Sequence, residues 1–359
     1  MQIHPLNKIP GSVIRWGIIG CGDVTEVKSG PGFESASGSR LVAVMRRNGT
    51  LAADYARRHN VPRWFDDGDR LIEDDEVDAV YVATPPAFHM QYALKAAAAG
   101  KPVYLEKPMA RNAEESDRIR DAFTQAQLPL FVAYYRRALP RFLSIKDLIA
   151  KGAIGTVTSV TSYFAAPYHR LAPTWRNDAA SAGGGHFVDR GSHTLDLIDY
   201  LLGPLTDVAG VASNLASNYE VEDTVSLSFR TMCGALGAGL WNFASEVHCD
   251  RLEISGTDGQ IECSVFEDAP VRLKNSHGVY ALEHEKILHV QQPLIQTAVD
   301  ELLGRGSCPS TGVSACRTAH VMDRALAAYY GDRKGPFWER ADAWPGRHGR
   351  VNRPGRADS

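Results

Sequence analysis

The sequence predicts an α/β fold with two domains: a doubly wound parallel sheet in the first half and an α+β arrangement in the second. The chain has 359 residues, more than one hydrophobic core usually organises, so two domains are expected. Short apolar runs alternate with helical segments from residue 13 to about residue 131. Strand-like runs follow one another without intervening helices from residue 207 to about residue 273.

The first half has the pattern of a parallel sheet. The expected strands are the apolar runs VIRWGII, RLVAVM, DAVYVA, PVYLE and LPLFVAYY. Helical segments separate them, for example Thr50 to His59 and Ala87 to Ala99, and Gly100 suits the C-cap of the latter. Continuous apolar strands between helices favour a parallel sheet covered on both faces. We assign residues 1–137 to this domain.

The second half has a different pattern, in which turns containing glycine join runs such as VSLSF, RLEISG and IECSVF. This pattern predicts an antiparallel or mixed sheet. A strand at 156–165 and four helices complete the expected elements, the helices at residues 140–150, 187–202, 293–303 and 313–329. We assign residues 138–339 to this domain and expect a disordered tail over residues 340–359, because the tail is rich in Gly, Arg and Pro.

Composition excludes several classes of function. The formal net charge of -3 provides no basic field for nucleic acid. No run of about 18 apolar residues predicts a membrane span, and the first residues lack the order of a signal peptide. The six cysteines form no C-x-x-C pair and are expected to be reduced thiols. We therefore expect a cytoplasmic protein that binds neither nucleic acid nor membrane.

A glycine-rich loop, Gly20-Cys21-Gly22-Asp23-Val24-Thr25, follows the first expected strand. Gly20 permits a tight turn, and Gly22 lets the backbone approach a pyrophosphate at the N-terminus of the next helix. The loop therefore predicts dinucleotide binding. The third position of the pattern is Thr25 rather than Gly or Ala, and an ordinary glycine turn is the alternative.

Two arginines follow the second expected strand. Sites specific for NAD place a carboxylate there to bind the 2′-hydroxyl of the adenosine ribose. Arg46 and Arg47 occupy the position instead, and guanidinium groups match a 2′-phosphate in charge and geometry. We therefore expect NADP(H) as the preferred cofactor and NAD(H) as the second choice. The alternative is that both arginines are ordinary solvated charges.

Other candidate residues follow later strands of the first half. Thr84-Pro85-Pro86 with His89, and Glu106-Lys107-Pro108, lie where strands of open α/β sheets end and ligands bind.

In the second half, three glycines at 183–185 precede His186, Asp189 and His193, and the last two share a helix face at a spacing of four. A surface or capping role is one alternative for this pair. Zinc binding by the three side chains is another, but no further ligands cluster nearby and we expect no metal.

Together these segments resemble the glucose-fructose oxidoreductase / inositol dehydrogenase / rhizopine catabolism (Gfo/Idh/MocA) family, from Arg15 to about Tyr330. The resemblance is carried by GIIGCGDV, ATPPAFH, EKP, YRRALP, WR and GGGHFVDRGSHTLDLIDYLLG, whose order and spacing are specific in combination. It implies a Rossmann domain followed by a domain with an open-faced, mostly antiparallel sheet. In relatives this sheet often forms the subunit interface, so a homo-oligomer, either a dimer or a tetramer, is expected.

The resemblance also implies roles for individual residues. Lys107 is expected near the nicotinamide and the reacting oxygen, Asp189 to hold the substrate, and His193 to exchange the proton. Trp175 and Arg176 match a loop that reaches over the cofactor in related enzymes. The sequence departs from the family pattern at three positions: Tyr135 stands where relatives often have Asn or Gln near the nicotinamide, Pro86 replaces a frequent Asn, and Arg190 replaces a small or apolar residue.

These residues predict an oxidoreductase that transfers hydride between the nicotinamide and a secondary alcohol or ketone. An imidazole suits the proton exchange because its reference pKa, about 6.5, lies near working pH. An ammonium at Lys107 would stabilise the developing alkoxide. Hydroxyl-binding groups favour a sugar, cyclitol or related polyol as substrate, namely Tyr163, Tyr168, His169, Trp175, Arg176 and Asp189. The alternatives are a non-catalytic regulatory protein that senses dinucleotide and sugar, and a metal-dependent enzyme.

Overall fold

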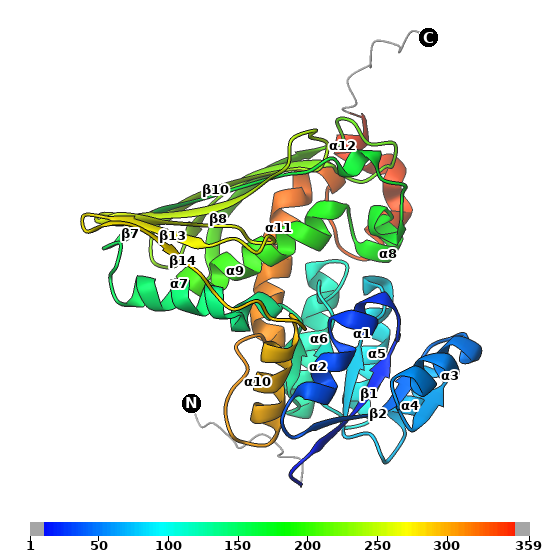
Figure 1. Ribbon diagram of the computed structural model, residues 1–359. Coiled ribbons are helices and arrows are strands. Elements are labelled where there is room, and N and C mark those ends of the chain that lie inside the picture. Colours follow the sequence, from blue (N-terminus) through cyan, green and yellow to red (C-terminus); the bar gives the residue numbers. More distant parts are fainter. Residues whose placement is uncertain (1–10, 349–359) are drawn as a thin grey trace. The chain divides into compact units, whose positions relative to one another are not determined.

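The computed structural model describes residues 11–348, which form two compact units (Figure 1). Of these residues, the first unit contains 11–144 together with 284–316, and the second contains 145–283 together with 317–348. Residues 284–316 therefore belong with the first unit, although the sequence pattern had grouped them with the second. The reason is the apolar face of α10 (Gln292–Leu302), whose Leu294, Ile295 and Val299 are buried in a core of the first unit.

The first unit is built on the expected parallel sheet. Its six strands lie in the order β3-β2-β1-β4-β5-β6, all parallel. The strands are β1 (Ile14–Ile19), β2 (Ser39–Met45), β3 (Arg63–Phe65), β4 (Ala79–Val82), β5 (Val103–Leu105) and β6 (Leu130–Val132). The order reverses between β1 and β4, the point at which such sheets bind ligands. The edge strand β3 was not expected, because its three residues include the exposed Trp64 and form no apolar run.

Helices cover both faces of this sheet, as predicted. Along β4, Tyr81 is buried in one core cluster, whereas Val80 and Val82 are buried in the other. The helical segments are α1 (Asp23–Val27), α2 (Gly30–Ser35), α3 (Gly49–Arg58), α4 (Gly68–Ile72), η1 (Pro86–Phe88), α5 (His89–Ala98), α6 (Ala113–Ala126), η2 (Tyr135–Ala138) and α10. The chain leaves α5 through Gly100 at φ +72°, in agreement with its expected role.

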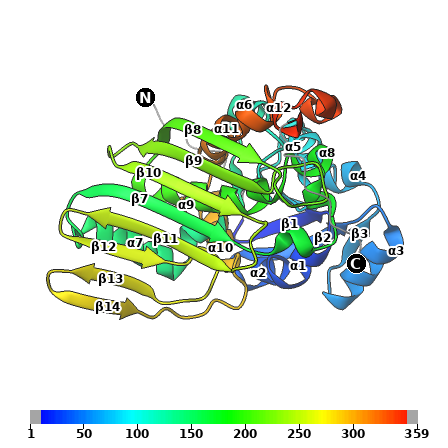
Figure 2. The same ribbon diagram turned by 90° about the horizontal axis from the view of Figure 1, so that it is seen from above.

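The second unit contains an eight-stranded sheet in the order β14-β13-β12-β11-β7-β10-β9-β8 (Figure 2). The strands are β7 (Val157–Ala165), β8 (Leu205–Ser213), β9 (Thr224–Thr231), β10 (Leu236–Asn242), β11 (Cys249–Gly256), β12 (Gly259–Cys263), β13 (Val271–Asn275) and β14 (Gly278–Leu282). Only β7 and β10 pair in parallel. The mostly antiparallel sheet is therefore confirmed. Burial alternates along β9 and β10, so one face of these strands is covered and the other is open.

The second unit also contains helical segments. They are η3 (Tyr168–Arg170), η4 (Trp175–Asn177), α8 (Ala179–Ala182), η5 (Phe187–Gly191), α9 (Ser192–Leu202), α11 (Gly312–Tyr330), η6 (Phe337–Ala343) and α12 (Pro345–His348). The close approach of Gly210 on β8 to Ala325 on α11 leaves no room for a side chain at residue 210. Both α7 (Pro140–Ala150) and α11 begin in the first unit and continue in the second. Among residues 11–348, no helix has the length and apolar character needed to cross a membrane.

The segment expected to be a disordered tail is folded at its start. Residues 340–343 lie in η6 and residues 345–348 in α12, so the expectation was wrong for this part of the tail. Trp344 is the reason: its ring is buried against Tyr330, and its indole N–H donates to the carbonyl of Phe337 at 3.0 Å. The prediction of disorder rested on the Gly, Arg and Pro content of the tail and did not take the packing of Trp344 into account. The remainder of the expected tail, 349–359, and the start of the chain, 1–10, lie outside the described residues.

Candidate active site

The glycine loop closes tightly at the end of β1. Gly20 adopts φ +91°, and a Cβ atom at this residue would lie 2.8 Å from Cγ2 of Thr84. The N–H groups of Gly20 and Cys21 donate to the carbonyl of Met45 at 2.8 and 3.1 Å. The loop therefore touches the ends of both β2 and β4, where the strand order reverses. Only glycine satisfies both the backbone angle and the close contact.

Thr25, the departure from the expected glycine pattern, completes this loop. Its hydroxyl donates to the carbonyl of Gly22 at 2.8 Å and accepts from the N–H of Gly22 at 2.9 Å. Thr25 itself is fully buried. The space beside Gly22 is open, since a Cβ atom there would meet only the Gly20 carbonyl oxygen, at 3.9 Å. Of the neighbouring candidates, Cys21 is buried, which raises the pKa of its thiol to about 11, whereas Asp23 is exposed.

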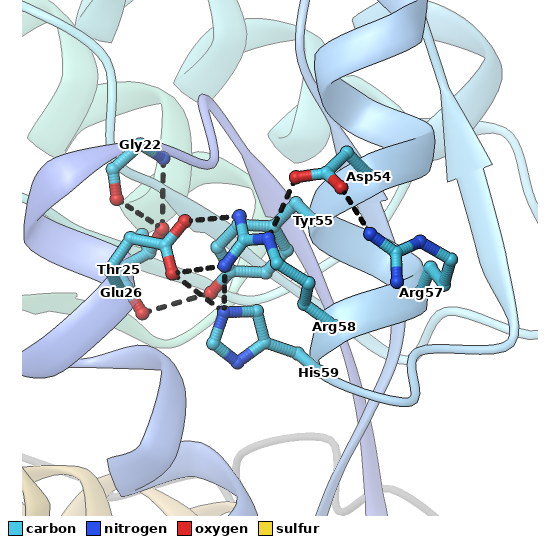
Figure 3. A network of polar contacts seen from close by, with 8 residues as sticks. All are labelled: Gly22, Thr25, Glu26, Asp54, Tyr55, Arg57, Arg58 and His59. Atoms are coloured by element: carbon cyan, nitrogen blue, oxygen red, sulfur yellow. Dashed lines mark hydrogen bonds and ion pairs between the residues drawn. The ribbon is translucent and has the colours of Figure 1, made fainter.

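A polar network fixes α1 to the end of α3 (Figure 3). Glu26 accepts from both terminal nitrogens of Arg58, at 2.7 and 2.9 Å, and its Oε2 lies 2.7 Å from Nε2 of His59. Asp54 accepts from Arg57 and Arg58, each at 2.7 Å. The hydrogen bonds from Arg58 hold the pKa of the Glu26 carboxyl at about 2. The charges of Arg57 and Arg58 are thus neutralised within the first unit.

Arg46 and Arg47 differ from those two arginines. Both are exposed directly after β2, and the N–H of Arg46 donates to the carbonyl of Phe65 at 3.2 Å. The guanidinium of Arg47 lies 5.1 Å from the centroid of the Phe88 ring. Neither guanidinium has an ion-pair partner within residues 11–348. Their positive charge is therefore available to a ligand.

His89 lies beneath the loops that follow β4 and β5. It is fully buried, with Nε2 at 2.7 Å from the carbonyl oxygen of Thr84 and Nδ1 at 3.1 Å from that of Pro108. Burial lowers its pKa. Because both ring nitrogens face backbone carbonyls, His89 joins Thr84 and Pro85 to the loop of Lys107. It acts as a support for these loops and does not present a free ring nitrogen to a ligand.

Glu106 is the centre of a buried network under Lys107. Its carboxylate accepts from the Tyr81 hydroxyl and from Nε2 of Gln291, both at 2.7 Å, and from the backbone N–H of Lys107 at 3.0 Å. The Tyr81 hydroxyl also lies 3.0 Å from Oγ of Ser29. Sequence reasoning missed Gln291, because its segment had been grouped with the other domain. The network fixes the backbone from which the Lys107 side chain extends.

Lys107 and Tyr135 lie within electrostatic reach of each other in the first unit. Lys107 is half-buried, and its peptide bond to Pro108 is cis. Burial raises the pKa of the Tyr135 phenol, but the charges of Arg136, Lys28 and Lys107 together hold it below its ordinary value. The first unit thus gathers a glycine loop, two uncompensated arginines and a lysine at the carboxyl ends of its strands.

In the second unit, Asp189 and His193 share one continuous helical segment. Residues Phe187–Gly191 form a π-helical turn, and α9 follows without a break. His193 is buried, with its ring centroid 6.1 Å from that of Phe266. Nε of Arg176 lies 3.5 Å from Oδ2 of Asp189, and the Arg176 guanidinium stacks on Trp175 at 4.3 Å. This unit therefore brings together four of the residues that the sequence had singled out.

Glu222 fixes the glycine turn that leads into this helix. Both of its carboxylate oxygens accept from the N–H of Gly185, at 2.9 and 3.0 Å, and it accepts a short hydrogen bond from the Tyr330 hydroxyl. Arg333 donates to the carbonyl of Gly183 at 2.9 Å. Glu222 is fully buried, and burial raises its pKa. No local sequence signal marks Glu222, Tyr330 or Arg333, which lie far along the chain from the glycine turn that they fix.

His186 stabilises the same turn from its other side. Nδ2 of Asn177 donates to Nε2 of His186 at 3.0 Å, and the ring packs edge-on against Tyr168 at 4.8 Å. Burial lowers the pKa of His186 to about 4. Within residues 11–348, no three His, Cys, Asp or Glu side chains gather in a way that could hold a metal ion.

Tyr163 does not join this group. It alternates along β7 with Phe164, whose ring packs against Tyr168, Phe243 and Phe266. Consecutive strand residues point to opposite faces of a sheet, so Tyr163 extends away from this aromatic cluster. Its expected contact with substrate receives no support from the second unit. Phe243 and Phe266, which do belong to the cluster, were missed because each is a single aromatic residue in a strand-rich region.

The family is decided by comparison with known proteins. The family model described as "Oxidoreductase family, NAD-binding Rossmann fold" matches residues 14–134. A second family model, that of the GFO/IDH/MocA C-terminal domain, matches residues 142–262. The chain belongs to the GFO/IDH/MocA family. Its first unit is the NAD-binding domain of that family, and the resemblance seen in the sequence is confirmed.

Individual relatives agree with this assignment. Oxidoreductase P35 of Formosa agariphila is 38% identical over 87% of this chain and 98% of its own length. Levoglucosan dehydrogenase of Pseudarthrobacter phenanthrenivorans is 34% identical over 66% of this chain and 59% of its own length. A structure of levoglucosan dehydrogenase with NADH and levoglucosan superimposes with a TM-score of 0.79 at 23% identity, covering 87% of this chain and 97% of that one. At this identity the superposition shows the shared fold.

Proposed function

We propose that this GFO/IDH/MocA oxidoreductase transfers hydride between NADP(H) and a secondary alcohol or ketone of a sugar, cyclitol or related polyol. The observation that carries the proposal is the buried Glu106 carboxylate, which fixes the backbone of Lys107 at the carboxyl end of β5. A relative that acts on a sugar derivative, levoglucosan dehydrogenase, supports the substrate class.

The first unit has features that fit a dinucleotide. The space beside Gly22 is open to a phosphate group, and Gly20 keeps the loop against Thr84. Oγ1 of Thr84 is buried without a hydrogen-bond partner among residues 11–348. The uncompensated charges of Arg46 and Arg47 support NADP(H) over NAD(H), because a 2′-phosphate adds negative charge at the end of β2. Tyr135, Trp175 and Arg176 are proposed as further cofactor contacts.

A bound nicotinamide would accept or supply the hydride. The chain's own residues then have three tasks. His193 would take the proton that the alcohol oxygen releases, or return it when a ketone is reduced. The Lys107 ammonium would stabilise negative charge on that oxygen, and Asp189 would accept a hydrogen bond from a substrate hydroxyl. A general acid or base such as His193 contributes roughly 10²- to 10⁴-fold to the rate.

Lys107→Met tests the proposal, since it removes the charge and retains most of the side-chain volume. Turnover would be followed at 340 nm with NADPH and a panel of keto-sugars and inososes, and NADPH binding by fluorescence titration. We expect turnover to fall by about 10²-fold or more while NADPH binding stays within a few-fold. Lys151→Met is the matched control, because Lys151 is an exposed residue paired with Asp147.

Two results would count against the proposal. Normal turnover in a folded Lys107→Met enzyme would remove Lys107 from the mechanism. Tight NADPH binding by the unmodified protein, with no turnover on the whole panel, would favour the regulatory alternative, a sensor of dinucleotide and sugar.

We also propose that the protein is a homo-oligomer associated through the open face of its eight-stranded sheet. Leu236 and Leu240 on β10, together with Val211 on β8, are exposed apolar residues of this sheet. Large exposed apolar patches are typical of association surfaces.

The cytoplasm is the proposed location, since the six cysteines form no disulfide, as expected in a reducing compartment.

A further inference from the structure

The guanidinium of Arg190 is stacked between two aromatic rings. Its central carbon lies 5.4 Å from the centroid of Tyr168 and 4.9 Å from that of Phe266. The side chain is half-buried and follows Asp189 directly on the π-helical turn. Within residues 11–348, no carboxylate or other hydrogen-bond acceptor pairs with this guanidinium.

The nearby carboxylates are committed to other groups. Asp189 pairs with Arg176 at 3.5 Å. Asp250 accepts from three successive backbone N–H groups, those of residues 265, 266 and 267, at 3.1, 2.6 and 3.1 Å. Glu246 pairs with Arg170 at 2.7 Å and lies 3.4 Å from Nε2 of His169. The positive charge of Arg190 is therefore not compensated by these three groups.

The two rings that hold the guanidinium are themselves fixed. Tyr168 packs against His186 at 4.8 Å and against Phe243 at 5.8 Å. Phe266 packs against Phe164 at 5.2 Å, and Asp250 fixes the backbone of its turn. Phe266 also contacts His193, so the proposed proton-exchanging imidazole and the Arg190 guanidinium pack against the same ring. A charged group held in this way loses little conformational entropy when a ligand binds.

A planar guanidinium with unused donors is suited to a carboxylate, which accepts two parallel hydrogen bonds from it. A sugar hydroxyl, by contrast, accepts at a single oxygen and carries no charge to offset the cation. A phosphate dianion usually needs more than one cation, and the neighbouring Arg170 and Arg176 are already paired with carboxylates.

We propose that Arg190 binds a carboxylate of the substrate, so that the enzyme prefers an acidic sugar, such as a hexuronate, over its neutral counterpart. This inference rests on the proposed function and narrows its substrate class. Arg190 would then be a specificity-determining residue beside Asp189 and His193. A polar pocket that pairs a substrate charge can discriminate strongly, because the unpaired guanidinium is left without a partner when the neutral sugar binds.

The test compares matched substrates that differ only in a carboxylate against a hydroxymethyl group, such as glucuronate with glucose and galacturonate with galactose. The measured quantity is the ratio of kcat/KM for acid over neutral sugar. We expect the unmodified enzyme to favour the acid by about 10- to 100-fold, the size of a charged hydrogen-bonded contact. Arg190→Gln should bring the ratio near one, chiefly through KM, and Arg190→Lys should give an intermediate value.

Arg57→Gln is the matched control, because Arg57 is an exposed α3 residue paired with Asp54. It should retain the selectivity of the unmodified enzyme. A ratio near one in the unmodified enzyme, or an unchanged ratio in Arg190→Gln, would overturn the carboxylate subsite and leave the oxidoreductase proposal standing. Preference for a hexose phosphate over the hexuronate would overturn the carboxylate assignment in the same way.

A binding measurement separates this inference from the proposed function. Glucuronate and glucose would be titrated calorimetrically into the NADPH-loaded protein and into the loaded Arg190→Gln variant. Tighter binding of glucuronate that Arg190→Gln removes supports the subsite, even if neither sugar turns over. Equal binding of both sugars to both proteins overturns it.

Discussion

Nδ2 of Asn177 lies 3.0 Å from Nε2 of His186, so the amide donates a hydrogen bond to the imidazole. The amide orientation follows from its other end, since Oδ1 of Asn177 accepts from the N–H of Thr174 at 3.0 Å. A ring nitrogen that accepts a hydrogen bond carries no proton, so the buried His186 is neutral in this arrangement. The contact joins the loop of Trp175 and Arg176 to the turn that begins the helix of Asp189 and His193.

Stability should fall in mild acid because of His186. Burial lowers the pKa of the folded-state ring to about 4, whereas the unfolded-state value stays near 6.5. The contribution of the neutral His186 ring to the free energy of unfolding is therefore fully present above pH 6.5, and it is lost as the pH falls from 6.5 to 4. It amounts to roughly 3 kcal/mol in total, of which about 2 kcal/mol is lost by pH 5.

His186→Gln tests this, because glutamine offers an amide oxygen to Asn177 and does not titrate. The free energy of unfolding would be measured by denaturant titration at pH 7.5 and pH 5. The advantage of the unmodified protein over the variant should shrink by about 2 kcal/mol at the lower pH. His277→Gln, at an exposed residue of the second unit, is the control. A constant difference between the unmodified protein and His186→Gln at both pH values would contradict the assignment.

Gly20→Ala should destabilise the first unit and weaken dinucleotide binding. Gly100→Ala provides the comparison, since Gly100 also has positive φ, at +72°, but has no atom within 4 Å of its Cβ position. That substitution should cost about 1 kcal/mol of unfolding free energy, through backbone conformation alone. Gly20→Ala adds a Cβ only 2.8 Å from Thr84, so its loss should be larger, about 2 to 4 kcal/mol.

Both variants would be measured by chemical denaturation and by fluorescence titration with NADPH. Binding should weaken only for Gly20→Ala, because the glycine loop must shift to admit the methyl group. Equal losses of stability and binding in the two variants would mean that the contact with Thr84 does not matter.

Replacing Arg46 and Arg47 together with glutamine should weaken NADPH binding far more than NADH binding. The two cofactors differ by the 2′-phosphate, and each charged hydrogen bond to it contributes about 1.5 to 3 kcal/mol. We expect the ratio of the two dissociation constants to change by at least 10-fold. Arg57→Gln is the control, since Arg57 is an exposed arginine whose charge is paired with Asp54. Equal weakening of NADPH and NADH, or none, would return both arginines to the role of solvated surface charges.

Local sequence was sufficient to predict five of the six strands of the parallel sheet in the first unit. Apolar runs such as those of β1 and β2 are buried on both faces, and the helices between them carry their own start and stop signals. Gly20 could be assigned to a tight turn and Gly100 to a helix C-cap, and both have positive φ, a conformation that favours glycine strongly. The family followed from motifs that are each short but occur in a specific order.

Tertiary structure decided the groups that support the candidate residues. Glu222, Tyr330 and Arg333 fix the turn at 183–185, yet Glu222 lies 37 residues from its hydrogen-bond partner Gly185. The Glu106 network reaches Gln291 across 185 residues. Buried polar groups need partners, but the partner is selected by chain topology and not by spacing along the sequence.

The sequence by itself determined most of the elements, where the glycine turns lie, and which charged and aromatic residues are available for chemistry. Those properties depend on side-chain periodicity and backbone preference, which act over a few neighbouring residues. Only the folded chain decided which charges are neutralised and which are not. Sequence alone does not distinguish Arg58 from Arg190. In the folded chain Arg58 is bound by Glu26 and Asp54. Arg190 is held between Tyr168 and Phe266 with its donors unused. Electrostatic compensation acts through space, and for that reason it appears only when distant segments are packed together.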